Sequence, residues 1–480
     1  MAANATIIAP LQKRMWETQM TNQIILGSVF ESLSNRMVKT APPQNGDIVT
    51  VPDSVISYVS DKFDAGTMYV TIPALDKLRT KGVGGYTPAD GSEENVSLRY
   101  ARVFYNVKRK AVTFADGTVD GDAVSAYPIL TEKVRLMGDY FAELNDYDKH
   151  RALILGADEF LTEASYWAAG NVYSGSAPVA LKIHPNTFIT GQLGVSVSSS
   201  LGAFSTSFTT QVQQLYANCN TTGVAARRFT KARLDGIVRY AKKAILPLNW
   251  KAGGQVITHV ITLTQEAANQ LQNDTTTAGA ANWWATFSEA MEGKEVENRT
   301  VTNILGCYQG CLILVDPRGP LFNTVDDNTL AALLGYANWA AVPSTLQDYV
   351  QQQRFQMVKP WSDASINSAV TNGLGIDAGD NRVPAAKVDG AAGATSGTME
   401  VCFVLGRTAL GVAEVKPLKF TDDTKDYDFR KGFEARTSNG NMRMDFTNQN
   451  VAVTGWSGLT AFANNWSSAM FLVPTTNQVL

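Results

Sequence analysis

The sequence predicts an α+β protein with more than one packing unit, and three patterns support this class. They are an extended two-limbed ribbon over 66–114, one long helix over 127–155, and alternating strands and helices over 230–320. The chain has 480 residues, and single cores tend to split beyond roughly 250 to 300. Its hydrophobic fraction of 45% and charged fraction of 18% are those of an ordinary globular protein.

The composition excludes several classes of protein. Lysine and arginine total 41 against 44 acidic residues, so the net charge is -3. A dedicated nucleic-acid binder is usually clearly basic, so any DNA contact should be local or glancing. The start MAANATIIAPLQKRMWE lacks the apolar run of a signal peptide, and no run approaches the roughly 20 apolar residues of a membrane span. We therefore expect synthesis in the cytoplasm and no membrane partner.

The first 46 residues are predicted to form an arm. They combine a possible short helix over 14–33 with the proline-rich break APPQNG. From GDIVTV at 46–51 the pattern becomes extended.

The ribbon over 66–114 has a tip of turn formers and charge, GVGGYTPADGSEEN, and a basic returning limb, LRYARVFYNVKRKAVTF. The limb contains no acid and five cations: Arg99, Arg102, Lys108, Arg109 and Lys110. Side chains alternate along a strand, and neither face of this limb is cleanly apolar. Because an isolated hairpin is marginal in water, the ribbon needs a partner to lie upon.

The clearest helix is YPILTEKVRLMGDYFAELNDYDKHRALIL at 127–155. Apolar side chains recur in it at alternating steps of four and three, and so form one stripe: Leu130, Val134, Met137, Phe141 and Leu144. At 1.5 Å per residue this helix would span about 40 Å. It is predicted to be the long axis of an elongated molecule.

The remainder is predicted to be an α/β unit interrupted by loop-rich insertions. A helix is expected over 230–246, a buried strand at HVITL, a helix cap at Thr264, a helix at QEAANQL, and a strand pair in LGCYQGCLILVDPRGP. The loop-rich stretches are 165–229 and 344–399. An apolar strand, EVCFVLGRTALGVAEV, and a charged segment up to residue 446 follow, and the last thirty residues are predicted to be another arm.

Chemical motifs are scarce. Three histidines, His150, His184 and His259, have no second ligand at metal spacing, and we expect each to be structural. Four cysteines, Cys219, Cys307, Cys311 and Cys402, are too few for a disulfide scaffold, and the pair in LGCYQGCLILV suits small buried strand residues.

Other candidate motifs are incomplete. The stretch from Asp116 imitates a calcium loop, but Tyr127 stands where the bidentate glutamate should be. No Walker sequence, nucleophile elbow or dinucleotide fingerprint is complete. We therefore expect no catalytic, cofactor-binding or metal-binding residues, and no enzyme.

The order of these elements resembles the major capsid proteins of tailed bacteriophages. The residues that carry the resemblance are GDIVTV, GGYTPADGSEENVSLRYARVFYNVKRKAV, VITLTQEAANQLQND, LGCYQGCLILVDPRGP and EVCFVLGRTAL. More narrowly, the chain looks like the branch typified by the podophage N-four coat protein, within the Hong Kong ninety-seven capsid fold. The resemblance runs from about residue 45 to 447.

The resemblance implies a domain order. It comprises an N-terminal arm (1–46), an extended loop with its flanks (47–121), a peripheral domain with a spine helix and an insertion (122–229), an axial domain (230–415) with the insertion 344–399, peripheral return strands (416–447), and a C-terminal arm (448–480). It also implies hexamers and pentamers of one chain in an icosahedral head. A separate scaffolding protein, a portal protein, decoration protein, and double-stranded DNA on the inner face are the further partners that it implies.

In this resemblance the basic limb contacts a neighbouring subunit through Arg99, Arg102, Lys108, Arg109 and Lys110. Two other interpretations of the limb stay open: a DNA grip, with phosphate contacts and steep salt dependence, and a solvated strand face. Two other functions also stay open for the whole chain, an enzyme with an unrecognised site in 230–415 and a nucleic-acid-binding protein.

Overall fold

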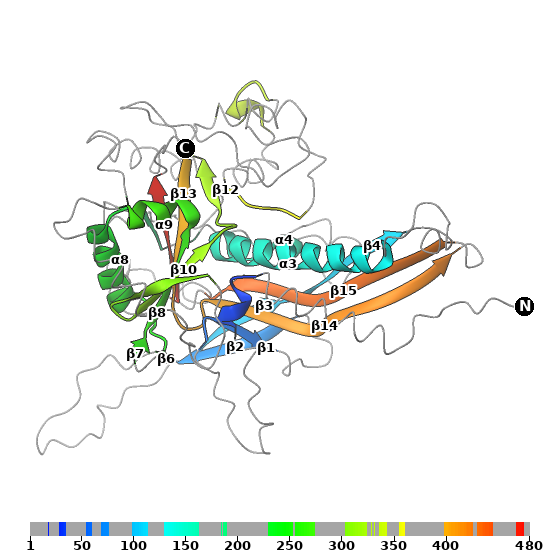
Figure 1. The fold of residues 1–480 in the computed structure, drawn as a ribbon, viewed down its shortest axis with the longest axis horizontal. Coiled ribbons are helices and arrows are strands. Elements are labelled where there is room, and N and C mark those ends of the chain that lie inside the picture. Colours follow the sequence, from blue (N-terminus) through cyan, green and yellow to red (C-terminus); the bar gives the residue numbers. More distant parts are fainter. Residues whose placement is uncertain are drawn as a thin grey trace, which may run out of the picture.

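The structure is a computed structural model. It describes residues 18, 28–34, 54–59, 69–75, 98–113, 129–162, 184, 186–189, 229–252, 255–273, 303–323, 328, 331, 336–342, 355–360, 398–425, 430–444 and 467–474. The fold is α+β, with an eight-stranded sheet beside a long helix and a long hairpin (Figure 1).

An eight-stranded sheet forms the larger core. Its strands are β5 (Thr187–Ile189), β8 (His259–Thr264), β9 (Ile304–Tyr308), β10 (Cys311–Asp316), β11 (Leu321–Asn323), β12 (Phe355–Gln356), β13 (Thr398–Leu405) and β16 (Ser468–Pro474). Strand β10 runs parallel to β8 and antiparallel to β9, while β13 lies between β8 and β16. All six residues of β8 are buried, as expected for a central strand of an α/β unit.

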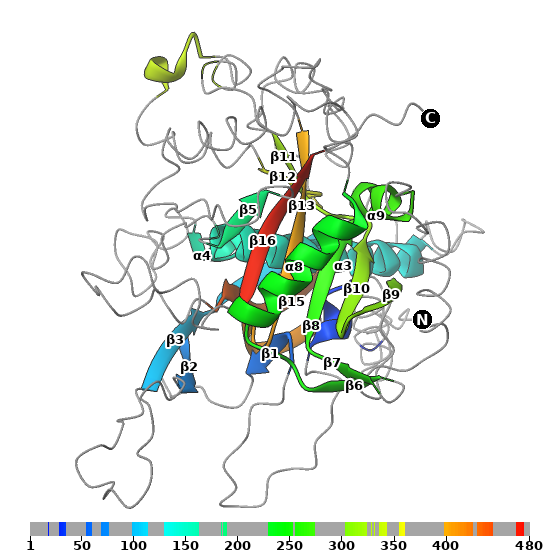
Figure 2. The ribbon, with the colours of Figure 1, turned by 90° about the vertical axis from the view of Figure 1, so that its left-hand side faces the viewer.

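Two helices cover one face of this sheet, α8 (Lys231–Ala244) and α9 (Gln265–Gln272) (Figure 2). The apolar face of α8 is buried through Leu234, Ile237, Val238 and Ala241. The Thr264 side chain accepts a hydrogen bond from the Ala267 amide, which confirms the predicted cap of α9. The predicted strand pair is also confirmed, since β9 and β10 form a hairpin.

The second unit pairs a long helix with a long hairpin. Helix α3 (Ile129–Leu155) lies along β14 (Leu410–Lys425) and β15 (Arg430–Arg443), as Figure 1 shows. The stripe predicted for the helix is buried against Leu418, Phe420 and Ala435, through Val134, Met137, Phe141 and Leu144. Two further strands, β1 (Ile56–Val59) and β4 (Asn106–Thr113), complete a sheet of order β1-β14-β15-β4.

The predicted ribbon exists but is shorter than expected. Strands β2 (Tyr69–Leu75) and β3 (Leu98–Phe104) pair antiparallel in a two-stranded sheet of their own. The returning limb, predicted as one strand, breaks at Tyr105 into β3 and β4, and β4 joins the hairpin sheet instead. The break coincides with a close crossing of backbones: a Cβ atom on Gly440 would lie 2.0 Å from the Phe104 carbonyl oxygen.

Residues 28–34, predicted to belong to an arm, are part of the core. They contain the 3₁₀ helix η1 (Glu31–Leu33) and bury Val29, Phe30 and Leu33 against the inner face of the eight-stranded sheet. The arm prediction is wrong for this stretch, because its apolar side chains face the same cluster as the end of α3. The rest of residues 1–46 lies outside the described residues, apart from Thr18.

The C-terminal arm prediction is also wrong for β16. This strand pairs with β13 over its whole length and also borders β5. Met470 and Leu472 are buried on one face of the sheet, and Phe471 and Val473 on the other. A strand that is apolar on both faces belongs inside a sheet. The position of β16 near the end of the sequence favoured the arm interpretation instead.

The stretch EVCFVLGRTALGVAEV, predicted as one strand, contributes to both sheets. Strand β13 ends at Leu405, and β14 begins at Leu410 in the other sheet. Gly406 lies in the connection, where a Cβ atom would be 2.2 Å from the Leu246 carbonyl oxygen. The remaining elements are α4 (Glu159–Thr162), β6 (Trp250–Ala252), β7 (Gln255–Ile257) and η3 (Trp339–Ala341).

Several predictions concern residues outside those described. They include GDIVTV, the ribbon tip, the turn that begins at Asp116, and most of the loop-rich stretches 165–229 and 344–399. None of the described helices is both long enough and apolar enough to cross a membrane.

Candidate functional site: the basic limb and the buried hub of the long helix

The five predicted contact residues do not lie together. Arg99 and Arg102 are on β3, opposite Ala74 and Thr71 of β2. Lys108, Arg109 and Lys110 are on β4, opposite β15 of the same chain. The structure therefore divides the basic limb between a ribbon and a sheet.

Lys108 is an internal residue and not a surface contact. Its Nζ lies 2.5 Å from Asp148 Oδ2 and 2.8 Å from Asp158 Oδ2, and its side chain is 2% exposed. The same Asp158 carboxylate accepts a hydrogen bond from the Asn441 amide at 3.0 Å. Lys108 thus joins β4 to α3 and to the turn that follows this helix. Its burial corrects the interpretation of Lys108 as an intersubunit contact.

Arg109 and Lys110 are exposed. The Arg109 side chain is 68% exposed and its Nε lies 3.7 Å from Glu434 Oε1, a long and solvated ion pair. Lys110 Nζ lies 4.7 Å from the centre of the Tyr140 ring, so this lysine extends over α3. Both remain available to another molecule.

The second half of α3 carries a buried ionic hub. We use this name for Asn145, Asp146, Asp148, Lys149 and His150 with their partners. Lys149 Nζ lies 2.7 Å from Glu31 Oε1, and both side chains are at most 1% exposed. The same oxygen accepts hydrogen bonds from Asn145 Nδ2 and from the Tyr58 hydroxyl. One carboxylate of the N-terminal segment therefore links α3 to β1.

The hub also connects α3 to the eight-stranded sheet. His150 Nε2 lies 2.5 Å from Asp316 Oδ2, at the end of β10. Arg318 Nη1 donates to Asp146 Oδ2 at 2.8 Å, and the Ser28 hydroxyl also donates to Asp146. At the end of the helix, Arg443 donates to the carbonyl oxygens of Leu153 and Ile154, which α3 itself leaves unpaired. These buried charged side chains have oppositely charged partners, because an unpaired charge is costly to bury.

Burial shifts the ionisation of the hub. It raises the pKa of Asp148 to about 7, and Lys108 opposes that shift while Asp158 adds to it. Burial likewise raises the pKa of Asp146 to about 6, with a further contribution from Asp316. Burial alone would lower the pKa of His150, but the neighbouring Asp316 carboxylate outweighs it, so this pKa is raised.

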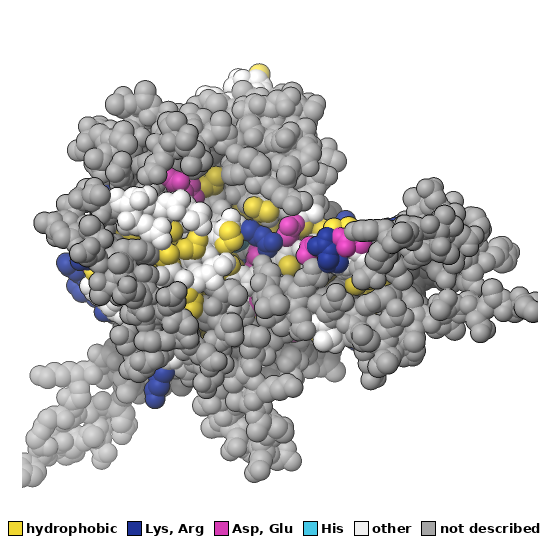
Figure 3. All heavy atoms as spheres, viewed as in Figure 1, with side chains coloured by type: hydrophobic (Ala, Val, Ile, Leu, Met, Phe, Trp, Pro, Cys, Tyr) yellow, Lys and Arg dark blue, Asp and Glu magenta, His cyan; other side chains and the backbone are white. Residues whose placement is uncertain are grey.

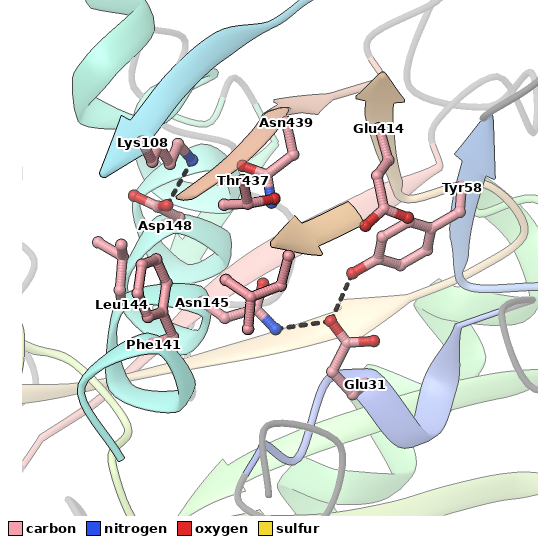
Figure 4. A pocket seen from close by; sticks show the side chains of 11 residues that line it. Glu31, Tyr58, Lys108, Phe141, Leu144, Asn145, Asp148, Glu414, Thr437 and Asn439 are labelled. Atoms are coloured by element: carbon pink, nitrogen blue, oxygen red, sulfur yellow. Dashed lines mark hydrogen bonds and ion pairs between the residues drawn. The ribbon is translucent and has the colours of Figure 1, made fainter. Parts of the chain in front are cut away.

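A small pocket lies beside the hub, between α3 and the hairpin, with a volume of about 40 Å³ (Figure 4). Glu31, Lys108, Asp148, Glu414 and Asn439 are among its lining residues. A polar cavity of this size has room for a few water molecules. Within the described part of the chain, no group of three or more His, Cys, Asp or Glu is placed to hold a metal ion.

The histidines and cysteines serve packing roles in the described regions. His184 Nε2 lies 2.9 Å from the Ser468 hydroxyl, and His259 Nε2 lies 3.3 Å from the Ile245 carbonyl oxygen. Cys311 and Cys402 are buried and Cys307 is half-buried, and all three are free thiols. Burial raises the pKa of Cys311 to about 12, which makes this thiol a poor nucleophile.

Over the outer side of α3 the surface is mixed in charge. Figure 3 shows Lys and Arg side chains beside Asp and Glu side chains along this helix. Arg135 pairs there with Glu132 and with Asp139, both one helical turn away. This side of the helix is a balanced, solvated face.

Sequence reasoning missed the hub. Its one visible signal is that 145–151 is polar or ionisable on every side of the helix and runs directly into the apolar ALIL. Because the end of this helix is buried on all sides, the charged side chains of 145–151 cannot all reach solvent. Their partners Glu31, Asp316 and Arg318 lie more than a hundred residues away in the sequence, so no local pattern reveals them.

No protein-family model matches the sequence, and no curated protein matches it. Solved structures do match. The chain is similar to the capsid of Ralstonia phage GP4, with a TM-score of 0.49 at 12% identity over 93% of this chain and 97% of that one. It is similar to the acidic stable capsid of Helicobacter pylori bacteriophage KHP30, with a TM-score of 0.46 at 12% identity over 91% and 94%. It is also similar to the capsid of cyanophage Pam1, with a TM-score of 0.45 at 14% identity over 92% and 98%.

Proposed function

We propose that this chain is the major capsid protein of a tailed bacteriophage. Copies of it would associate into hexamers and pentamers and close an icosahedral head around double-stranded DNA. The observation that carries the proposal is the β2–β3 ribbon, which joins neither of the larger sheets. A two-stranded ribbon is marginal in water. Its base packs on its own chain, where Val70 and Val103 are buried beside Ala413 and Met442, and we expect the part beyond this base to lie on another copy.

The order of elements supports the same proposal. The ribbon is followed by a 27-residue helix, the α/β sheet with α8 and α9, and then the long hairpin that returns to the helix. This is the order that the resemblance to phage capsid proteins predicts. In this assignment α3 is the spine helix of a peripheral domain, and the eight-stranded sheet is the core of the axial domain.

The chemistry of the hub supports a structural role. Its charged side chains pair with one another and connect four parts of the chain: the N-terminal segment, β4, β10 and the hairpin. Such a network holds two units in one orientation, which a shell subunit needs. We therefore propose a non-enzymatic protein of the virion, synthesised in the host cytoplasm, whose further partners are a separate scaffolding protein, a portal protein, decoration protein and packaged DNA.

Replacing residues 82–95, the ribbon tip, by a short Gly-Ser linker tests the proposal. If the ribbon serves assembly, the variant stays soluble, unfolds cooperatively, and fails to form closed shells. Circular dichroism melting and negative-stain microscopy measure the two properties separately. Normal shells from this variant would contradict the role given to the ribbon, and loss of folding would show that the tip belongs to the core of its own chain.

A further inference from the structure

Two ion pairs, one helical turn apart, join α3 to the end of β10 and the turn that follows it. His150 Nε2 lies 2.5 Å from Asp316 Oδ2, and Arg318 Nη1 donates to Asp146 Oδ2 at 2.8 Å. Asp146 and His150 are four residues apart on the helix, so their side chains lie on the same side. We call the four residues of these two pairs the junction latch: Asp146, His150, Asp316 and Arg318.

On the side of the sheet, the latch is built into a tight turn. The second oxygen of Asp316, Oδ1, accepts a hydrogen bond from the Arg318 amide at 2.9 Å, and the Asp316 carbonyl oxygen accepts one from the Gly319 amide at 3.2 Å. A Cβ atom on Gly319 would lie 2.3 Å from Thr264 Cγ2, at the start of α9, so the turn packs closely on this unit. The Asp316 carboxylate is therefore fixed relative to the eight-stranded sheet.

The end of α3 is attached to the same sheet by apolar contacts. Its last turn, 152–155, is fully buried and shares one core with Leu312, Leu314 and Phe403 of the sheet (Figure 1). Burial of apolar surface has no preferred direction, whereas a charge-assisted hydrogen bond has a defined geometry. The apolar turn is therefore suited to be a pivot, and the latch is suited to set the angle at which α3 leaves the sheet.

The latch is electrically balanced when His150 is protonated. Its two carboxylates, Asp146 and Asp316, then face two cations, the imidazolium of His150 and the guanidinium of Arg318. Half-buried Glu143 lies 3.9 Å from Arg318 Nη2 and adds a further negative charge. Asp146 and Asp316 are at most 4% exposed, so loss of the His150 proton leaves buried carboxylates with one arginine. Because an uncompensated buried charge is strongly destabilising, the junction then favours an arrangement in which water reaches Asp316.

The other neighbours of His150 do not replace its charge. Lys149, the next residue before it on α3, is engaged with Glu31 of η1 at 2.7 Å. The N-terminal segment and β13 present aromatic rings to the imidazole: the centroid of Phe30 lies 4.9 Å away and that of Phe403 lies 6.4 Å away. The balance of the latch therefore depends on the proton of His150.

The surroundings of His150 also favour that proton. Burial alone would lower the pKa of His150, but the Asp316 carboxylate raises it above the ordinary value of 6.5, and a hydrogen bond to the Asp146 backbone acts in the same direction. Burial and the charge of Asp316 raise the pKa of Asp146 to about 6, so this carboxyl ionises earlier. A raised pKa means that the stabilisation is present at low pH and is lost as pH rises through the folded value. The latch is therefore released on the alkaline side.

We propose that the proton on His150 controls the angle between α3 and the eight-stranded sheet. While His150 is charged, both ion pairs are closed and the angle is fixed. When the proton is lost, the pair with Asp316 opens and the helix turns about its apolar last turn. This device belongs to the single chain, so it goes beyond the proposed shell function and is tested on unassembled protein.

A distance measured across the junction tests the device directly on the full-length chain. Leu136 on α3 and Val256 on β7 are both 53% exposed, so each position accepts a spin label attached through a non-natural amino acid. Between pH 6 and pH 9 we expect a second, shifted distance population that grows as the pH rises. A label pair within the sheet unit, at Val256 and at exposed Arg239 of α8, is the control and should keep one distance throughout.

Two histidine variants show whether His150 carries the effect. His150→Gln removes the charge, so the shifted population should already be present at pH 6 and should not grow further. His259→Gln is the matched control, because this second buried histidine contacts the Ile245 carbonyl oxygen and lies outside the latch. It should keep the pH dependence of the wild type. If His150→Gln does not fold, Asp316→Asn removes the partner instead, and the wild-type titration decides alone if neither variant folds.

Three outcomes would overturn the latch. They are an unchanged distance across the junction in the wild type from pH 6 to pH 9, an unaltered titration in His150→Gln, and an equal shift in the control pair within the sheet unit. The last of these would show general loosening of the fold and no movement at the junction. Shell formation enters none of these measurements, so failure of the latch and failure of the proposed function remain distinguishable.

Discussion

Lys108 of β4 and Asp148 of α3 form an ion pair of 2.5 Å inside the protein, with both side chains 2% exposed. A second carboxylate, Asp158, lies 2.8 Å from the same ammonium group. Strand β4, helix α3 and the turn after this helix therefore meet at Lys108, which the sequence predicts as a subunit contact.

Replacing Lys108 should lower the stability of the folded chain itself, rather than weaken a contact between subunits. We expect Lys108→Met to lower the free energy of unfolding by about 3 to 5 kcal/mol, because it leaves buried carboxylates without a partner. Chemical denaturation of the full chain measures this loss. Lys110→Met, one pleat further along β4 and exposed, is the control and should cost at most about 1 kcal/mol. Equal effects of the two would contradict the internal role of Lys108.

The hub should make stability depend on pH in a defined direction. The pKa of Asp148 rises from its ordinary value of 3.8 to about 7 in the folded state, so between these values the folded protein holds a proton that the unfolded chain has released. The contribution of Asp148 to the free energy of unfolding therefore falls as pH rises from about 4 to 7, by up to about 1.4 kcal/mol per pH unit. The raised pKa of His150 acts in the same direction, since its stabilisation is lost as pH rises through the folded value. Urea titrations at pH 5, 6 and 7 should show a flatter profile for Asp148→Asn, and an unchanged slope would refute this assignment.

The packing of the long helix gives a second stability prediction. Phe141 is 4% exposed and contacts the hairpin, whereas Leu136 on the same helix is 53% exposed. We expect Phe141→Ala to cost about 3 to 5 kcal/mol and Leu136→Ala less than about 0.5 kcal/mol. Thermal melting of both variants tests this difference. Similar losses for the two would show that α3 packs with a different face.

The C-terminal strand should be essential for folding. A chain that ends at Trp466 lacks β16 and exposes the buried side of β13, so we expect insoluble protein. A chain that ends at Pro474 keeps the whole strand and should remain soluble. Solubility on expression gives the answer, and a soluble, cooperatively melting chain without β16 would restore the interpretation of this region as an arm.

Sequence patterns predicted those elements that form through contacts between residues close together in the sequence. The stripe of α3 and the cap at Thr264 depend on residues within a few turns, and both are present. The β9–β10 turn has Gln309 and Gly310 at φ values of 49° and 81°, the conformation that a tight hairpin requires. These elements follow from the chain's own periodicity and turn chemistry.

Elements that depend on distant partners were not predictable in this way. Strand β16 joins a sheet whose other strands begin as early as Thr187, and η1 packs against the end of a helix more than a hundred residues later. The burial of Lys108 depends on Asp148 and Asp158, which lie 40 and 50 residues later in the sequence. Side-chain alternation alone gives every second residue of β4 the same environment, so it could not separate Lys108 from Lys110.

The most direct test of the central claim is the size and shape of the particles that the full-length chain forms. Sedimentation velocity followed by electron microscopy of the native assembly measures both. A shell subunit predicts megadalton particles, seen as closed icosahedral heads built of hexamers and pentamers. A monomer or small oligomer as the native form would contradict it.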